Sequence, residues 1–408
     1  MNARIKGQQL EDLDNIPMRV ALFTDSDAFA GTERHIIDLG HSLAGPDVHV
    51  SIACPQPSPL ADRASATGLP VIPIAKRGKF LDTAAIRTLR RLLLSGQVDI
   101  IHAHNGRTAL AASVAARLAG RGKCVVTQHF LAPSHVGRTG PKGLFSRMAH
   151  GWVDSHTHAH IAISSAVRDS MIVRGESSST EVTVVPNGIS SPDVTALTTP
   201  ARIREELGVL ADAVFIACAS RLEPEKDLIT LLEAMPLLPA SPPVKLVIAG
   251  AGSMETELRN KIRDWQLGDC CSLLGFRQDV LSIINAADLF VLPSKAEPFG
   301  LVLLEAMSLG KPVIATAVGG PLEIVVSGVT GQLVPPNNPA ALATAIQQLV
   351  DDPSRRAEMG GQGRDRFEKY FTADRMGRET LDVYKALLGL PAEAAELPTE
   401  ISSPAPVH

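Results

Sequence analysis

Two glutamates, Glu297 and Glu305, stand eight positions apart around the tripeptide Phe299-Gly300-Leu301. The first follows a short apolar run, and the second falls about one turn into the apolar segment that comes next. Each carboxylate accepts two hydroxyl hydrogen bonds, so the pair could hold different hydroxyls of one extended polyhydroxy ligand. The backbone N–H groups of the tripeptide would add donors at a helix start. The alternative is an ordinary capped helix with an acid near its start.

Two cations, Arg221 and Lys226, lie in the segment RLEPEKD (221–227), which directly follows the apolar run 214–220. At the start of a helix, cations and free N–H groups together favour an anion. A diphosphate carries the charge to match them. The alternative is a solvated turn whose cations pair with the three acids of the same segment.

A glycine pair, Gly250 and Gly252, ends one apolar run and precedes a predicted helix. These glycines could let the backbone approach a ligand closely, and a simple turn would explain them equally well. The dinucleotide fingerprint G-x-G-x-x-G is not completed, because position 255 is glutamate. A nicotinamide-dependent dehydrogenase is therefore excluded.

Eleven of the twelve histidines lie in the first 160 residues. Two of them close one apolar run and His129 closes the next. A further group alternates along a predicted strand: His156, His158 and His160. Imidazole is a common metal ligand, but alternating side chains share a face only in an extended segment, and no cysteine or carboxylate group accompanies these three. We therefore predict no metal site and no cofactor.

The composition is that of a folded protein: 408 residues, 45% hydrophobic and 20% charged. A chain that is mainly disordered is excluded, because it would be more polar and more charged. A net charge of −4 and 4% aromatic residues argue against nucleic-acid binding. The five cysteines form no CxxC pair, and no signal peptide or membrane span is predicted. We expect a cytoplasmic protein.

Short apolar runs alternate with amphipathic helical segments, which predicts doubly wound parallel α/β sheets. The pattern restarts after a polar linker, so we predict an N-terminal domain over 17–189 and a C-terminal domain over 190–371. A helix over 372–390 is expected to return to the first domain. The tails 1–15 and 391–408 are predicted to be disordered. Ligands bind such sheets beyond the carboxyl ends of the strands, where the two glutamates, the two cations, the glycine pair and His129 are found.

The second half of the chain resembles the donor-binding domain of glycosyltransferase family 4, retaining enzymes with the GT-B fold. The resemblance is carried by RLEPEKD, AGAG, the stretch 273–320 with its two glutamates, and GVTGQLVPP. It covers 214–350 closely and 17–189 more loosely. It implies two Rossmann-like doubly wound domains that face each other across a cleft, and transfer of a sugar (a hexosyltransferase) from a nucleotide diphosphate sugar to a hydroxyl acceptor. A carbohydrate or lipid-linked acceptor and a role in cell-envelope, exopolysaccharide or glycolipid biosynthesis would follow.

The resemblance also implies roles for residues around the donor phosphates. Arg221 and Lys226 would hold the diphosphate, and Gly31 would add a backbone donor at a helix start in the first domain. The family often has two glycines there, whereas this chain has Ala30 and then Gly31. The family typically needs no metal, because basic residues and helix dipoles stabilise the leaving group.

For the rest of the donor, the resemblance implies that Glu305 binds the ribose hydroxyls and that Glu297 binds the sugar hydroxyls or the anomeric region. His129 matches a position whose imidazole faces the donor sugar, so Glu297 and His129 are the candidate catalytic residues. The resemblance further implies that the sugar or a phosphate is contacted by the backbone amides of Phe299, Gly300 and Leu301. Two other residues would lie beside the nucleobase, namely Phe276 and Arg277.

Charge is divided unevenly: residues 1–189 carry a net +5 and the remainder a net −9. The basic segment 137–152 contains four large apolar residues and could touch an anionic membrane from the side. The alternative is a helix packed on the core. Two further functions stay open: a GT-B-fold sugar-nucleotide epimerase and a silent binding protein. The intact cations and glutamates argue against both.

Overall fold

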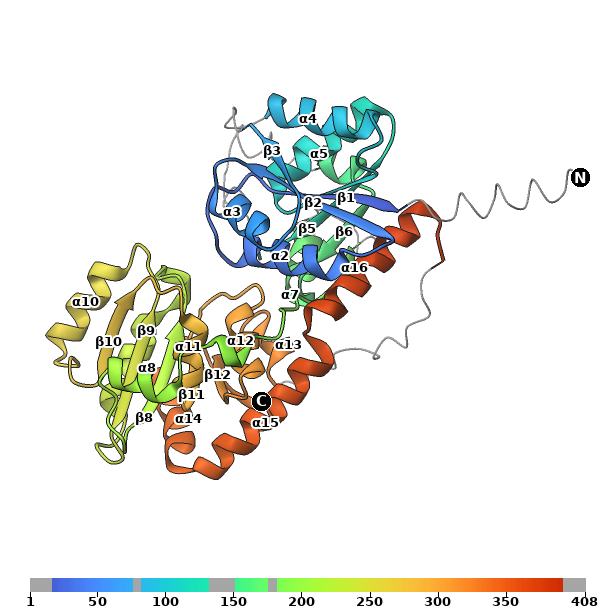
Figure 1. Ribbon diagram of the computed structural model, residues 1–408. Coiled ribbons are helices and arrows are strands. Elements are labelled where there is room, and N and C mark those ends of the chain that lie inside the picture. The colour runs from blue at the N-terminus through green and yellow to red at the C-terminus, as the bar shows by residue number, and fades with distance from the viewer. Residues whose placement is uncertain (1–16, 76–81, 132–150, 175–181, 392–408) are drawn as a thin grey trace, which may run out of the picture. The chain divides into compact units, whose positions relative to one another are not determined.

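The computed structural model describes residues 17–75, 82–131, 151–174 and 182–391 (Figure 1). These residues form two compact units. The first contains the described residues up to Asn187 together with those from Ala373 onward, and the second is Gly188–Thr372. The predicted tails lie outside the described residues, apart from residue 391, and so does the basic segment 137–152 apart from its last two residues.

In the first unit, the described residues form a seven-stranded sheet with the order β3-β2-β1-β4-β5-β6-β7. Each neighbouring pair is parallel. The strands are β1 (Met18–Phe23), β2 (Val48–Pro55), β3 (Val71–Ile74), β4 (Ile100–Ala103), β5 (Lys123–Gln128), β6 (Ala159–Ala162) and β7 (Val182–Val184). Four central residues of β1 show why the apolar runs are continuous: Val20 and Leu22 face one core, and Ala21 and Phe23 face the other.

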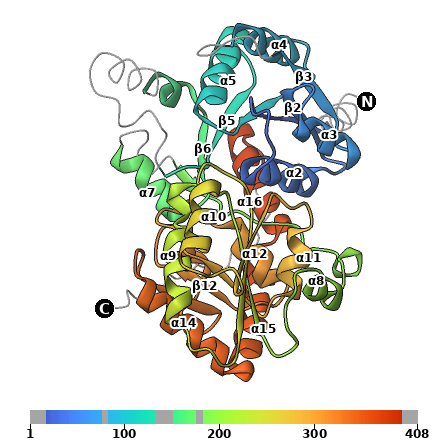
Figure 2. The same ribbon diagram turned by 90° about the vertical axis from the view of Figure 1, so that its left-hand side faces the viewer.

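Helices cover both faces of this sheet. Helices α4 and α5 lie on one face, and α2, α3 and α16 lie on the other (Figures 1 and 2). The helices of this unit include α2 (Gly31–Leu43), α3 (Pro59–Ala66), α4 (Thr83–Leu94), α5 (Gly106–Ala119), α7 (Ser165–Val173) and α16 (Ala373–Leu388). The last helix of the described residues, α16, packs against α2, where the Ser42 hydroxyl donates a 2.8 Å hydrogen bond to the Ala373 carbonyl.

The second unit has a six-stranded sheet of the same design, with the order β10-β9-β8-β11-β12-β13 and only parallel pairs. Its strands are β8 (Val214–Ala219), β9 (Val244–Ala249), β10 (Cys271–Gly275), β11 (Leu289–Leu292), β12 (Val313–Thr316) and β13 (Gly331–Val334). Its α-helices are α8 (Pro200–Glu206), α9 (Leu228–Ala234), α10 (Glu255–Asp264), α11 (Val280–Ala286), α12 (Leu301–Ser308), α13 (Pro321–Ile324), α14 (Pro339–Asp351) and α15 (Pro353–Tyr370).

In both units the strand order reverses beside the first strand, between β1 and β4 and between β8 and β11. A switch point of this kind opens a crevice beyond the carboxyl ends of its two strands. The loops that follow these four strands carry several of the candidate residues, and His129 and Phe276 follow the nearby strands β5 and β10. Among the described residues, no helix is both long enough and apolar enough to cross a membrane.

Candidate functional site

In the second unit, Lys226 and Glu297 form a close ion pair at the switch point. The Lys226 Nζ atom lies 2.6 Å from Glu297 Oε2, and the two side chains are 13% and 8% exposed. The Ser294 hydroxyl donates a 3.1 Å hydrogen bond to the same oxygen. The ammonium therefore compensates a carboxylate that would otherwise be buried without a countercharge.

The two loops that carry this pair are bound to each other by their backbones. The N–H groups of Lys295 and Ala296 donate to the Glu225 carbonyl, at 2.8 and 3.4 Å. The Lys295 ammonium also pairs with Asp227 at 2.9 Å. Because β8 and β11 are neighbours in the sheet, loops separated by about 70 residues in sequence meet at one edge. The position of Lys226 opposite Glu297 is thus fixed by several contacts.

Arg221 lies in the same turn as Lys226 but is far more accessible. Its side chain is 59% exposed and pairs with Glu225 at 2.7 Å, four residues along the chain. Exposed pairs of this type contribute less than about 1 kcal/mol. Arg221 can therefore exchange Glu225 for a stronger anion at little cost.

Helix α12 begins directly after the loop that bears Glu297. Its N-cap residue, Gly300, has a φ of 106°, a left-handed conformation that side chains rarely adopt. Phe299 and Gly300 are buried, whereas Leu301 and Glu305 are partly exposed. Glu305 lies in the second turn of the helix, so the two glutamates come from one loop and from the helix that follows it.

The glycine pair after β9 serves contact between two loops of the protein. A Cβ atom on Gly250 would lie 1.8 Å from the Ser220 carbonyl oxygen, and one on Gly252 would lie 2.4 Å from that of Leu222. The Leu222 N–H donates to Ala251 at 2.9 Å, so the loop after β9 presses against the loop that begins with Arg221. The two glycines thus let the loop after β9 pack closely against the loop that carries Arg221 and Lys226.

Phe276 and Arg277 follow β10 at the edge of the sheet. The Phe276 side chain is an isolated apolar group, 73% exposed. The Arg277 guanidinium pairs with Asp279 and with Glu206, both at 2.7 Å, and these hydrogen bonds raise its pKa. Arg277 is therefore held in place while the ring beside it stands open to a planar partner.

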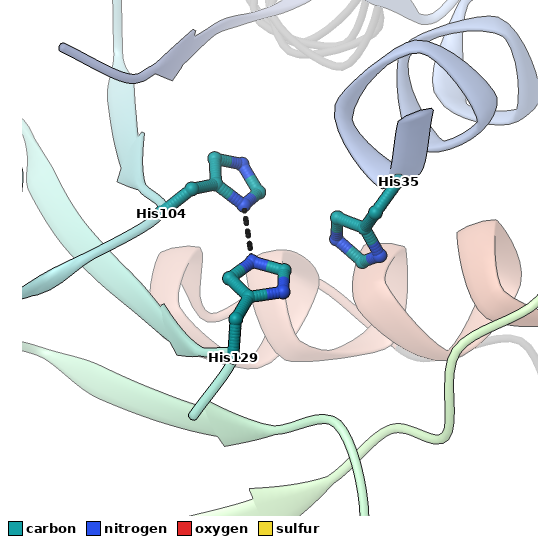
Figure 3. A group of neighbouring side chains, drawn as sticks. All are labelled: His35, His104 and His129. Carbon is teal, nitrogen blue, oxygen red and sulfur yellow. Dashed lines mark hydrogen bonds between the residues drawn. The ribbon is translucent and has the colours of Figure 1, made fainter. Parts of the chain in front are cut away.

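In the first unit, three histidine rings meet beyond the carboxyl ends of β4 and β5 (Figure 3). His104 follows β4, His129 follows β5, and His35 reaches them from α2. His104 Nδ1 lies 3.2 Å from His129 Nε2. All three are buried, at 4%, 0% and 5% exposure for His35, His104 and His129. His35, which the sequence did not single out, is spaced like any apolar residue of an amphipathic helix.

Burial keeps this histidine group neutral. It lowers the pKa of His35 to about 4, with a small opposing effect from Asn187. Burial and then the neighbouring histidines hold the pKa values of His104 and His129 well below the usual value. A neutral imidazole has one N–H donor and one nitrogen lone pair, so each ring can donate and accept at ordinary pH.

A fourth histidine, His102, connects this group to helix α16. Its Nδ1 lies 2.6 Å from the Tyr384 hydroxyl of α16, and its Nε2 lies 2.6 Å from the Thr127 hydroxyl. Its ring stacks on that of His104 with 4.4 Å between centroids. Burial, followed by the charge of His35, lowers the pKa of His102 to about 3. No motif in the sequence indicated Tyr384.

Gly31 is the first residue of α2 and is exposed. The N–H of the preceding Ala30 donates to the Glu33 carboxylate at 2.8 Å, so one backbone donor at the start of the helix already has a partner within the helix.

The alternating histidines His156, His158 and His160 have separate partners. The His156 ring stacks on Trp152, His158 Nδ1 accepts a 3.1 Å hydrogen bond from the Cys124 N–H, and His160 lies 2.9 Å from Asp154.

Two family models match the chain, one in each unit. The model described as Glycosyl transferases group 1 matches residues 201–366, and the model described as Glycosyltransferase Family 4 matches residues 29–191. The first match contains Arg221, Lys226, Glu297 and Glu305. The second contains the three clustered histidines.

Named relatives agree with these models. An alpha-maltose-1-phosphate synthase of Mycobacterium tuberculosis is 30% identical over 400 residues, which cover 90% of this chain and 99% of that one. An uncharacterized glycosyltransferase of Methanocaldococcus jannaschii is 37% identical over 194 residues, covering 45% of this chain and 47% of its own length. This chain thus spans about half of the archaeal relative and nearly all of the mycobacterial one.

A solved structure shares the fold. HepE of Anabaena, in complex with UDP-glucose, superposes with a TM-score of 0.78 and 24% sequence identity. The superposition covers 90% of this chain and all of that one.

Proposed function

Since this chain belongs to the family 4 glycosyltransferases, we propose that it moves a sugar from a nucleotide diphosphate sugar to a hydroxyl group of an acceptor, with retention of the anomeric configuration. The observation that carries this proposal is the Lys226–Glu297 pair at the switch point of the second sheet, with Arg221 in the same turn. A cation and a carboxylate held side by side suit a ligand in which phosphate oxygens and sugar hydroxyls are neighbours.

Arg221 and Lys226 bind the diphosphate in this proposal. The Lys226 ammonium has three donors, so it can keep Glu297 and still bind a phosphate oxygen. Arg221 leaves Glu225 and forms a two-pronged contact with the phosphates. Gly31 adds a backbone N–H from the first turn of α2. When the sugar–phosphate bond breaks, negative charge grows on the leaving diphosphate, and these groups stabilise it.

The two glutamates bind the hydroxyl-bearing parts of the donor. Glu305 accepts hydrogen bonds from the ribose, and Glu297, already oriented by Lys226 and Ser294, accepts them from the transferred sugar or lies beside its anomeric carbon. The backbone of Phe299, Gly300 and Leu301 binds the sugar or a phosphate at the start of α12.

On the side of the first unit, His129 is proposed to act on the transferred sugar. Because the ring is neutral, it can accept a proton or a hydrogen bond from a hydroxyl. His104, 3.2 Å away, orients it. Phe276 and Arg277 lie beside the nucleobase, where the exposed ring can stack.

Turnover is proposed to need no metal, because Arg221 and Lys226 neutralise the charge of the leaving diphosphate. The acceptor is proposed to be a carbohydrate or a lipid-linked sugar, as in cell-envelope, exopolysaccharide or glycolipid synthesis. The relatives named above include a synthase that makes a phosphorylated maltose, which supports a sugar or sugar phosphate as acceptor.

Release of nucleoside diphosphate tests the proposal. Purified protein is incubated with UDP-, GDP- and ADP-sugars in the presence of a chelator, with and without a panel of sugars and sugar phosphates. We expect one donor to be consumed, faster with the right acceptor. Lys226→Ala should abolish this release, whereas Lys369→Ala, at an exposed position of α15, should not change it. Equal consumption by Lys226→Ala and wild type would contradict the assignment.

A further inference from the structure

We infer that His35, His104 and His129 form a site for a single transition-metal ion of the Zn²⁺ type, and that an ion bound there inhibits the enzyme. The inhibition rests on the proposed function, because it follows from the role of His129. The binding does not, because it concerns only three side chains of the first unit.

The three rings have the spacing of a metal site. Their centroids form a nearly regular triangle, with separations of 4.8 Å (His35–His129), 5.4 Å (His35–His104) and 5.5 Å (His104–His129). Imidazoles that share a tetrahedral Zn²⁺ at about 2.0–2.1 Å place their ring centres roughly 5 Å apart. Figure 3 shows the rings arising from separate elements around one shared space, with His35 facing the His104–His129 contact.

The nitrogen positions agree with this spacing. His104 Nδ1 and His129 Nε2 are 3.2 Å apart, and two ligands of a tetrahedral Zn²⁺ lie about 3.3 Å apart. One nitrogen of each ring lies within 4.8 Å of the others, so the third ligand must move by no more than about 1.5 Å to complete the set.

Buried polar atoms without a partner point to a ligand in this space. Among the described residues, neither nitrogen of His35 nor Nε2 of His104 meets a partner at hydrogen-bonding geometry, although the Asn187 side chain, whose Oδ1 also lacks such a partner, lies near enough to His35 to affect its pKa. Each such atom costs about 1–3 kcal/mol when it is buried. An ion that receives a lone pair from one nitrogen of His35 would recover part of that cost, whereas Nε2 of His104 would keep its proton.

The ligand set selects the type of ion. It contains imidazoles alone, and no carboxylate of the described residues belongs to the group. Imidazole favours Zn²⁺, Co²⁺, Ni²⁺ and copper, whereas Mg²⁺, Ca²⁺ and Mn²⁺ prefer oxygen ligands. His102 is excluded as a fourth ligand, because both of its nitrogens are engaged by Tyr384 and Thr127. Three protein ligands leave one position of a tetrahedral ion open.

Metal binding would disable His129. The nitrogen that faces His104 would donate its lone pair to the ion, so the other ring nitrogen would carry the proton and could no longer accept one from a sugar hydroxyl. The sugar-facing role proposed for His129 would then be lost. The chain would thus combine a reaction that needs no metal with a site through which a transition metal inhibits it.

Binding is tested on the full chain after chelation and removal of the chelator, by calorimetry with ZnCl₂ and by visible absorption with CoCl₂. We expect one equivalent of Zn²⁺ to bind and Co²⁺ to give the intense bands of a tetrahedral site. His35→Gln and His104→Gln should each weaken Zn²⁺ binding at least about tenfold. This is a lower bound, because the loss of a residue that only hydrogen-bonds a metal ligand already costs about tenfold. The matched control is His49→Gln, an exposed histidine on β2, which should bind like wild type.

Equal Zn²⁺ affinity in wild type and His35→Gln, or a Co²⁺ spectrum without tetrahedral bands, would overturn the site. If both histidine variants unfold, the wild type alone decides: Zn²⁺ must raise its melting temperature, and no rise overturns the site. Inhibition is read separately, as the Zn²⁺ concentration that halves nucleoside diphosphate release in wild type and in His49→Gln. If neither releases any product, the proposed function fails, while the metal titrations still decide the site.

Discussion

The Lys226 ammonium lies 2.6 Å from the Glu297 carboxylate, in a position where neither side chain is more than 13% exposed. Seventy-one residues separate the two in sequence, and the adjacency of β8 and β11 brings them together. Each residue thus fixes the other. A ligand that binds Lys226 meets an ammonium already oriented by a carboxylate, and a hydroxyl that reaches Glu297 meets a carboxylate already held by Lys226 and Ser294.

Lys226→Ala should lower both stability and donor affinity. The substitution leaves the Glu297 carboxylate with the Ser294 hydroxyl but without a countercharge, at a cost of about 2 kcal/mol in the free energy of unfolding of the second unit. Urea unfolding measures this cost. The double variant Lys226→Ala/Glu297→Gln should regain at least half of it, because the uncompensated charge is gone. An unfolding free energy as low in the double variant as in Lys226→Ala would argue against the pairing.

Glu305→Gln should weaken donor binding without affecting the fold. The side chain is partly exposed in the second turn of α12, and the amide keeps its size while losing the charge that ribose hydroxyls prefer. We expect an affinity loss of about tenfold, measured by calorimetry with the donor that the protein consumes. Glu368→Gln, on the exposed face of α15, is the control. Unchanged affinity would remove Glu305 from the ribose site.

His129→Ala should slow turnover more than it weakens donor binding. The proposed contact is made with the reacting sugar, whereas the two cations proposed to bind the diphosphate, Arg221 and Lys226, lie in the second unit. Steady-state rates and donor affinity, measured on the same preparation, separate the two effects. A variant that turns over at the wild-type rate once saturated with donor would contradict this role.

Tyr384→Phe should destabilise the first unit by about 1–2 kcal/mol, because it removes the hydroxyl that pairs with His102 at 2.6 Å and leaves a buried nitrogen alone. Turnover should also fall, since His102 stacks on His104, which contacts His129. Tyr370→Phe on α15 is the matched control. Equal melting temperatures for Tyr384→Phe and wild type would show that this hydrogen bond contributes little.

Stability should fall as the pH drops from about 6.5. Burial lowers the pKa of His35 to about 4 and that of His102 to about 3. Below about pH 6.5 the unfolded chain therefore binds protons that the folded chain does not bind. The contribution of these neutral rings to the free energy of unfolding is therefore complete above the unfolded pKa of about 6.5. It is lost as the pH falls toward the folded pKa values. Each of these two histidines should cost about 2 kcal/mol at pH 5.

Urea unfolding at a series of pH values measures this loss. The exposed-site variant His49→Gln should follow the wild-type curve. The free energy of unfolding of His35→Gln should fall less steeply with pH, because this variant lacks one of the two histidines that take up a proton on unfolding. A wild-type protein equally stable at neutral pH and at pH 5 would contradict the buried, neutral state of these rings.

Much of the fold could be predicted from the sequence. Continuous apolar runs such as VFIACA, separated by amphipathic helices, are sufficient to indicate parallel sheets covered on both faces, and the structure confirms two such units. The strand order could not be derived from the runs alone, because it depends on which strands pair across the chain. The pairing of Lys226 with Glu297 follows from that order.

The histidine group shows where sequence patterns fail. His104 and His129 could be singled out because they close strands at the edge where ligands bind. His35 could not, since it occupies a core-facing position of α2 like any apolar residue, and Tyr384 belongs equally to the buried face of α16. Only the arrangement of the sheet under these helices brings their polar atoms to one place.

The central claim is that the loop of Arg221 and Lys226 binds the diphosphate of a nucleotide sugar. Calorimetric titration of UDP, GDP and ADP, each free and as the glucose conjugate, tests it most directly, with wild type, Lys226→Ala and Lys369→Ala compared side by side. We predict that one nucleotide series binds wild type and Lys369→Ala equally and binds Lys226→Ala at least about tenfold more weakly. Equal affinity for all three proteins, or no binding of any nucleotide to wild type, would contradict the account.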